Sequence, residues 1–149
     1  MKFLQTDKRF NSLVNAYGCH FMSMLDMAER LSGLTLTLTQ VQFLYDDAVE
    51  SEFMDAECTL SKPHMVVNLA FDSLGIDQHC NQIGAIHNGM VTFWGKPTVP
   101  EKIRATILEG VTERSKHYRG GDECCQLVYD PNPNARVLKV TRVLLYTAS

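Results

Sequence analysis

The stretch Gly18-Cys19-His20-Phe21-Met22-Ser23-Met24 opens a segment whose apolar residues recur at helical spacing. Ser32-Gly33 is typical of the end of such a helix. A helix N-terminus offers free backbone N–H groups and the positive end of the helix dipole, and both favour the thiolate form of a cysteine placed there. The stretch therefore predicts a core-facing helix over residues 19–32, with Cys19 either as a nucleophile or as a buried structural thiol.

A second candidate half-site lies near the other end of the chain, where His117 and Asp130 flank a predicted hairpin. A cysteine, a distant histidine and then an acid is the chain order of nucleophile, base and orienting residue in papain-like enzymes. If the hairpin turns at Asp122-Glu123, Asp130 is a diagonal neighbour of His117. A bulge near Gly120-Gly121 would place the two directly opposite. Either register puts the two side chains within reach of each other.

Length, charge and cysteine content limit the function classes. The chain has 149 residues, and we expect one domain over residues 1–149. The net charge of −3 is spread along the chain, so nucleic acid is not an expected partner. The first residues lack the apolar core of a secretory signal and no stretch is long enough to cross a bilayer, which predicts a cytoplasmic protein. An odd number of cysteines without framework spacing favours reduced thiols.

The first half of the chain reads as helical. Residues 2–16 show no sustained period and predict an extended segment before the Cys19 helix. Thr37 and Gln40 form a capping box ahead of a predicted helix over about residues 38–54. A further helix is predicted to begin near Pro63 and to end at Gly75.

From Ile76 onward, short apolar runs separated by turn formers predict antiparallel strands. Asn88-Gly89 is a good hairpin turn, while Thr98 and Glu101 leave a short helix as an alternative to the third strand. The predicted strands cover about residues 83–86, 90–94, 103–107, 116–120, 124–129 and 137–146. Helices first and antiparallel strands afterwards is the α+β pattern, in which helices pack on one side of a sheet.

No metal site and no cofactor are expected. Adjacent cysteines chelate one ion poorly, and no Cys-x-x-Cys or His-x-x-x-His spacing occurs. Cys124 and Cys125 are predicted to face opposite sides of a strand. The remaining histidines are predicted to be surface or hydrogen-bonded core residues: His20, His64, His79 and His87. The methionines at 22, 24 and 27 are predicted to pack in the core.

The two ends of the chain together resemble the C39-like cysteine peptidases, a papain-like group. Gln5-Thr6-Asp7-Lys8-Arg9-Phe10, followed by Gly18-Cys19 and Met22-Ser23-Met24, is similar to the N-terminal motif of that family. His117 on a strand, followed by a strand that ends in Asp130-Pro131, is similar to its C-terminal motif. Residues 34–113 match only in the order of elements. The resemblance implies a papain-like fold, with N-terminal helices packed against a C-terminal antiparallel β-sheet.

The resemblance also implies a role for each site residue. Cys19 would be the nucleophile, His117 the general base and Asp130 the residue that fixes the imidazole tautomer. The side-chain amide of Gln5 would form the oxyanion hole with the Cys19 backbone N–H. The implied activity is that of a small thiol hydrolase, a peptidase or amidase, acting on peptides that include peptidoglycan stems and peptide leaders. A compact chain of this type without a signal segment is consistent with a phage or prophage origin, and action at the cell wall would then need a separate exit route.

Alternatives remain open at the level of the sequence. His20, where the family often has Gly, and the mixed strand after His117 favour a catalytically idle papain-like binding or inhibitory module. A transglutaminase-like acyltransferase would share the same triad and differ only in what resolves the acyl-enzyme. Taken singly, Gln5 reads as a surface residue, His117 as an ordinary strand histidine and Asp130 as the start of a turn.

Overall fold

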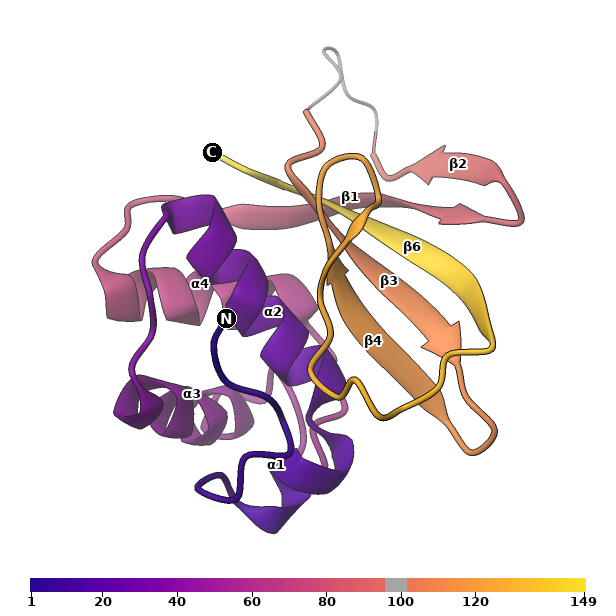
Figure 1. Cartoon of the computed structure of the whole chain (residues 1–149). Helices are drawn as coiled ribbons and strands as arrows, with labels where there is room; N and C mark the ends of the chain where they lie inside the picture. Colours follow the sequence, from indigo (N-terminus) through magenta and orange to yellow (C-terminus); the bar gives the residue numbers. More distant parts are fainter. Residues whose placement is uncertain (96–101) are drawn as a thin grey trace.

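The chain folds into a group of helices that lies beside an antiparallel sheet (Figure 1). The computed structural model describes residues 1–95 and 102–149. The helices are α1 (Ser12–Tyr17), α2 (Cys19–Ser32), α3 (Leu38–Glu50) and α4 (Pro63–Leu74). The strands are β1 (Cys80–His87), β2 (Met90–Phe93), β3 (Ala105–Val111), β4 (Lys116–Gly121), β5 (Leu127–Tyr129) and β6 (Lys139–Ala148). Helices followed by a sheet confirm the predicted α+β class.

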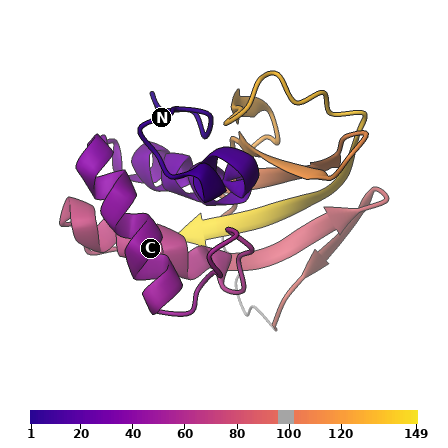
Figure 2. The same cartoon turned by 90° about the horizontal axis from the view of Figure 1, so that it is seen from below.

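The sheet has the strand order β2-β1-β6-β3-β4-β5, and each neighbouring pair is antiparallel. The β1–β2 hairpin turns at Asn88 and Gly89, whose φ angles of 51° and 74° suit a type I′ turn and confirm the predicted position. Seen from below, the helices gather on one side while β6 runs through the middle of the sheet (Figure 2). Among the described residues, no helix combines the length and the apolar character needed to cross a bilayer.

Helix α2 joins the two layers, because it contacts α4 on one side and β4 on the other. It begins at Cys19 and ends at Ser32 as predicted, and Gly33 closes it with a φ of 72°. Arg30 donates to Asp26 at 2.7 Å and to the carbonyl of Gly121 at 3.1 Å, which fastens α2 to β4. Its three predicted core methionines are fully buried. The fully buried apolar side chains of α2 are Phe21, Met22, Met24, Leu25, Met27 and Ala28.

The predicted capping box is confirmed at the start of α3. The Gln40 N–H donates to the Thr37 hydroxyl at 3.2 Å, and the Thr37 N–H donates to the Gln40 side chain at 2.9 Å. The helix ends at Glu50, earlier than predicted, because Glu52 adopts a φ of 61° and the Phe53 N–H turns back to the Ala48 carbonyl. Helix α4 has the predicted limits, with proline in its first turn.

The prediction that residues 2–16 are wholly extended is wrong, because the short helix α1 precedes α2. The Asn11 side chain accepts the Val14 N–H at 2.8 Å and so caps this helix. Gly18 joins the two helices at close quarters, since a Cβ at this position would lie 2.5 Å from the Val14 carbonyl oxygen. Only glycine fits that junction, which sets Cys19 at the first position of α2.

The strand predicted over residues 124–129 begins later than expected. The Asp122 carboxylate accepts the N–H groups of Cys124 and Gln126, each at 2.9 Å, and Cys125 has a φ of 64°. Cys124 and Cys125 therefore lie in a turn and do not face opposite sides of a strand. The strand predicted over residues 103–107 is confirmed as β3, which starts at Ala105. Thr98 and Glu101, the alternative helix cap, lie outside the described residues.

Candidate active site

His117 and Asp130 meet at the end of the β4–β5 hairpin. Nε2 of His117 lies 2.7 Å from Oδ1 of Asp130, and the His117 side chain is 4% exposed. The same carboxylate oxygen accepts the N–H of Asn132 at 3.1 Å, which fixes its orientation. A histidine that donates from Nε2 keeps Nδ1 as its basic nitrogen. The pairing predicted for these two residues is present, although Asp130 also starts a turn.

The register that produces this contact differs from the predicted one. The turn occupies residues 122–126, where a hairpin around 122 and 123 was expected. An irregularity follows Gly120, at the position expected for a bulge. Gly120 pairs with Tyr129, so the register carried one residue further makes Asp130 a diagonal neighbour of His117. The diagonal contact between His117 and Asp130 therefore results from a turn that is longer than predicted, combined with a bulge.

The Cys19 thiol lies near β4, where the backbone N–H of Tyr118, the residue after His117, favours its thiolate form. Burial raises the pKa of this thiol above its ordinary value, and the Asp130 carboxylate adds to the rise. The N–H groups of Tyr118, His20 and Cys19 act in the opposite direction but are outweighed. The backbone N–H groups at the helix N-terminus thus lower the pKa of the Cys19 thiol as predicted, but burial raises it by more. A thiol of this kind stays protonated near neutral pH until a base takes its proton.

Gln5 is buried, at 3% exposed, so its interpretation as a surface residue is wrong. Its backbone N–H donates to the Pro131 carbonyl at 3.0 Å, next to Asp130. Its side-chain Nε2 donates to the carbonyl of Asn15 at 3.2 Å, four residues before Cys19, and the Asn15 amide donates back to the Gln5 carbonyl at 2.6 Å. Gln5 is therefore fastened to both half-sites. Its Oε1 is buried without a hydrogen-bond partner among the described residues.

His20 is buried beside Cys19, and its ring stacks on Tyr118 with a centroid distance of 3.9 Å. Desolvation lowers the pKa of His20 to about 3, so the ring is neutral at physiological pH. Within residues 1–95 and 102–149, its Nε2 finds no hydrogen-bond partner. The prediction of a surface or hydrogen-bonded core histidine is wrong here, because stacking on an aromatic face takes the place of a polar contact.

A polar cluster that the sequence did not indicate continues from Tyr118 across the sheet. Glu109 pairs directly with Tyr118 on one side and with Arg142 on the other, from the adjacent strands β4 and β6. The Tyr118 hydroxyl donates to Glu109 at 2.7 Å, and Arg142 Nε donates to its second oxygen at 2.7 Å. Tyr118 follows Glu109 by nine residues and Arg142 follows it by 33, and only knowledge of the strand register would have brought the three residues together.

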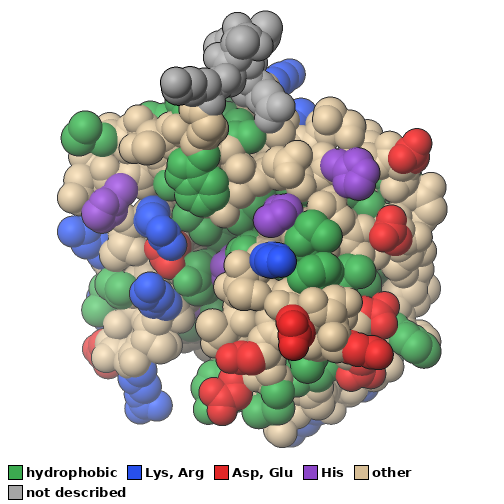
Figure 3. Space-filling model, turned by 180° about the vertical axis from the view of Figure 1, so that it is seen from behind, with side chains coloured by type: hydrophobic (Ala, Val, Ile, Leu, Met, Phe, Trp, Pro, Cys, Tyr) green, Lys and Arg blue, Asp and Glu red, His purple; other side chains and the backbone are tan. Residues whose placement is uncertain are grey.

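Cys19 lines a cavity of about 500 Å³ between the helices and the sheet. On the helical side the cavity is bordered by Cys19, His20 and Cys58, and on the sheet side by Tyr118, Arg142 and Trp94. Viewed from behind, the molecule has a hollow near the middle of its face, with hydrophobic side chains around it (Figure 3). Basic side chains gather on one side of this hollow and acidic ones on the other (Figure 3). The cavity is large enough for a drug-sized ligand.

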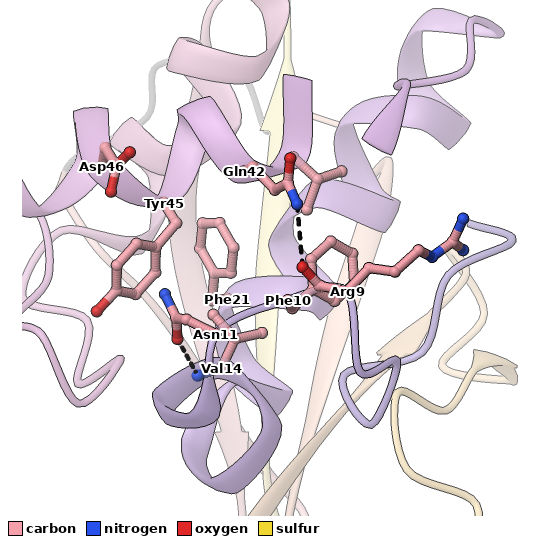
Figure 4. Close-up of a pocket in the computed structure, with 9 residues that line it drawn as sticks. Arg9, Phe10, Asn11, Val14, Phe21, Gln42, Tyr45 and Asp46 are labelled. Carbon is pink, nitrogen blue, oxygen red and sulfur yellow. Dashed lines mark hydrogen bonds between the residues drawn. The ribbon is translucent and has the colours of Figure 1, made fainter. Parts of the chain in front are cut away.

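A second cavity, of about 310 Å³, lies between α3 and the segment that leads into α1 (Figure 4). Its lining includes Phe10, Phe21 and Tyr45. The Gln42 side chain donates to the Arg9 carbonyl at 3.0 Å across this space. These contacts fasten the N-terminal segment to α3 and do not include Cys19.

The other thiols differ from Cys19 in their surroundings. All five cysteines fall in the described ranges and are free thiols. Burial raises the pKa of Cys58 and of Cys80 to about 12 each, whereas Cys124 is exposed. In the part of the chain that the structure describes, no group of three His, Cys, Asp or Glu side chains is placed to hold a metal ion.

Comparison of the chain with protein-family models, with curated proteins and with solved structures finds no match. The functional interpretation therefore depends on the residues and their geometry.

Proposed function

We propose that the protein is a small papain-like thiol hydrolase that cleaves an amide bond through an acyl-enzyme on Cys19. The main support is the 2.7 Å contact between His117 and Asp130, on a strand whose next residue, Tyr118, lines the same cavity as Cys19. The Asp130 carboxylate also acts on the Cys19 thiol, and the three residues follow the chain order of a papain-like triad. The same residues are those that resemble the C39-like peptidases.

The chemistry follows from the groups present. His117 Nδ1 takes the thiol proton as Cys19 sulfur attacks the amide carbonyl, and Asp130 holds the Nε2–H of the resulting imidazolium. The Cys19 backbone N–H and the second N–H of the Gln5 amide stabilise the oxyanion. The proton then passes from His117 to the leaving amine as the C–N bond breaks. Water, deprotonated by His117, attacks the thioester and releases the acid and the free thiol.

The proposed substrates are peptides, with peptidoglycan stem peptides and peptide leaders as the first candidates. A pool of such peptides, incubated with the protein and analysed by mass spectrometry, should yield new carboxyl and amino termini. Cys19→Ala, which keeps the helix start but lacks the nucleophile, should yield none. Acid quenching during turnover should show an acyl adduct on Cys19 in the intact protein. Failure to find either product or adduct across the pool would contradict the proposal.

An added amine acceptor separates hydrolysis from acyl transfer. If the acyl-enzyme is resolved by water, products are carboxylic acids whether or not the amine is present. If an amide of the added amine replaces them, the protein is an acyltransferase that uses the same triad.

The alternative function is a catalytically idle papain-like binding or inhibitory module. The observation that favours it is the raised pKa of the Cys19 thiol, since burial opposes the reactive form. An idle module would bind its partner equally well as wild type and as Cys19→Ala, and would form no acyl adduct. A comparison of binding for the two proteins tests this alternative.

A further inference from the structure

Arg142 brings a fixed positive charge to the wall of the cavity that contains Cys19. Its Nε and Nη2 donate to the two oxygens of Glu109 at 2.7 Å and 3.2 Å. This two-point contact sets the plane of the guanidinium group. The Arg142 side chain is 43% exposed and lines the cavity, whereas the Glu109 side chain is only 4% exposed. The cation therefore faces the cavity while its partner lies behind it.

The sheet wall of the cavity carries more positive than negative charge. Lys116 also lines it, with its ammonium 3.6 Å from Glu109. Glu109 already accepts the Tyr118 hydroxyl and both Arg142 contacts, so one buried carboxylate is shared between two cations. Glu57 borders the cavity from the helical side. A ligand that enters the cavity thus meets cations on the sheet wall and a carboxylate on the opposite wall.

Direct contacts connect Arg142 to a residue that lines the cavity beside Cys19. Arg142 donates to Glu109, Glu109 accepts the Tyr118 hydroxyl, and Tyr118 lines the cavity together with Cys19. His20 stacks on the Tyr118 ring and restrains it from the helical side. The position of Arg142 relative to the thiol is therefore fixed by packed side chains and cross-strand pairing.

We propose that Arg142 is a specificity-determining residue that binds a carboxylate of the substrate, so that the preferred substrates are amides with a carboxylate close to the scissile bond. This inference rests on the proposed function for the identity of the reaction. The anion preference of the cavity itself is independent of turnover. Lys116 adds to the attraction from a more exposed position, with 65% of its side chain accessible.

Two small alkylating reagents of nearly equal size test the proposal without a substrate. In each reaction the Cys19 thiolate forms an S–C bond, the C–I bond breaks and iodide leaves. Iodoacetate carries a carboxylate and iodoacetamide does not. The measured quantity is the rate constant for iodoacetate divided by that for iodoacetamide at Cys19, obtained by peptide mass spectrometry. This ratio cancels the intrinsic reactivity of the thiolate. Cys124, which is exposed and does not line the cavity, supplies a reference ratio in the same sample.

In Arg142→Gln the ratio at Cys19 should fall by about fivefold, the size of a close charge interaction near a protein surface. Lys116→Gln, the matched control, should lower it less. If Arg142→Gln does not fold, the double variant Glu109→Gln/Arg142→Gln replaces it, because that variant leaves no unpaired buried carboxylate. The ratio should fall in the double variant too, but by less, because the negative charge of Glu109 is removed together with the cation. An unchanged ratio in the folded variant would overturn the proposal.

The outcome is distinct from failure of the proposed function. His117 is the same in wild type and in the Arg142 variants, so its effect on the two reagents cancels and the change in ratio reports Arg142 alone. A protein whose Cys19 reactivity ignores His117 would contradict the hydrolase and would still give a ratio that depends on Arg142.

Discussion

The imidazoles of His117 and His20 have different surroundings, although both are buried. His117 faces the Asp130 carboxylate at 2.7 Å, and this contact fixes the orientation of its ring. His20 faces the ring of Tyr118, and burial lowers its pKa to about 3. Burial without a charged partner disables an imidazole as a base near neutral pH. The comparison indicates that the acid partner, more than closeness to the cysteine, selects which histidine can act.

Removal of the acid partner should have the largest effect. Asp130→Ala leaves Nε2 of His117 without its acceptor, and the imidazole loses its fixed tautomer. The rate of peptide cleavage should fall by about 10³–10⁴-fold. Asp130→Asn is the matched control, because its side-chain oxygen can still accept from Nε2 and from the Asn132 N–H. If both variants lose activity equally, the role assigned to the Asp130 oxygen is wrong.

Gln5 tests the oxyanion hole separately from the base. Gln5→Ala removes the proposed side-chain donor, and the cleavage rate should fall by about 10²–10³-fold. Alkylation by iodoacetamide passes through no oxyanion, so the Cys19 alkylation rate should match that of wild type and serve as the control for correct folding. Equal losses in both assays would assign Gln5 a structural role through its contacts with Asn15 and Pro131.

Glu109 is a charged group that holds the Tyr118 ring on which His20 stacks. Burial favours its protonated form, but hydrogen bonds from Arg142 and Tyr118 and the nearby cations outweigh this, so the pKa of Glu109 lies below its ordinary value of 4.5. A lowered folded-state pKa stabilises the fold at pH values above 4.5, and this contribution is lost as the pH falls through the folded-state pKa.

Glu109→Gln should therefore cost about 1–3 kcal/mol at neutral pH, the typical penalty for a buried hydrogen-bonding group left without its full set of partners. Urea unfolding at a series of pH values should show a smaller loss of stability on acidification in the variant than in wild type. Parallel pH profiles for the two proteins would argue against an ionised Glu109 in the folded state.

His20 should have the smallest effect. His20→Phe keeps a ring against Tyr118 and removes a nitrogen that is neutral at physiological pH. The pH profile of Cys19 alkylation should keep its shape above pH 5, and the rate should change by less than about threefold, under about 1 kcal/mol. A change in the profile as large as that caused by His117→Ala would assign His20 the role of base.

The sequence predicted those elements whose signals are local. The capping box at Thr37, the Gly33 end of α2 and the Asn88-Gly89 turn each depend on a few neighbouring residues, and each is confirmed. The α1 helix was missed because one Asn11 cap and six residues give too short a pattern for periodicity to detect. The turn at Cys124 was missed because its Asx hydrogen bonds depend on one side chain.

The candidate site divides in the same way. The order of residue types along the chain identified Cys19, His117 and Asp130 as candidates, and the structure pairs the last two. The Glu109 and Arg142 pairing depends on register between strands distant in the chain, which no local pattern encodes. The raised pKa of Cys19 depends on how deeply the helix start is buried, which is a property of the packed molecule.

The most direct test of the central claim is the pH dependence of Cys19 alkylation in wild type and in His117→Ala, with the other cysteines as internal references. Because burial raises the pKa of the Cys19 thiol, it needs His117 to react below the ordinary thiol range of about 8.5. We expect Cys19 alone to react at acidic and neutral pH in wild type, and to react in the variant only at alkaline pH. The same alkaline profile in both proteins would contradict the account.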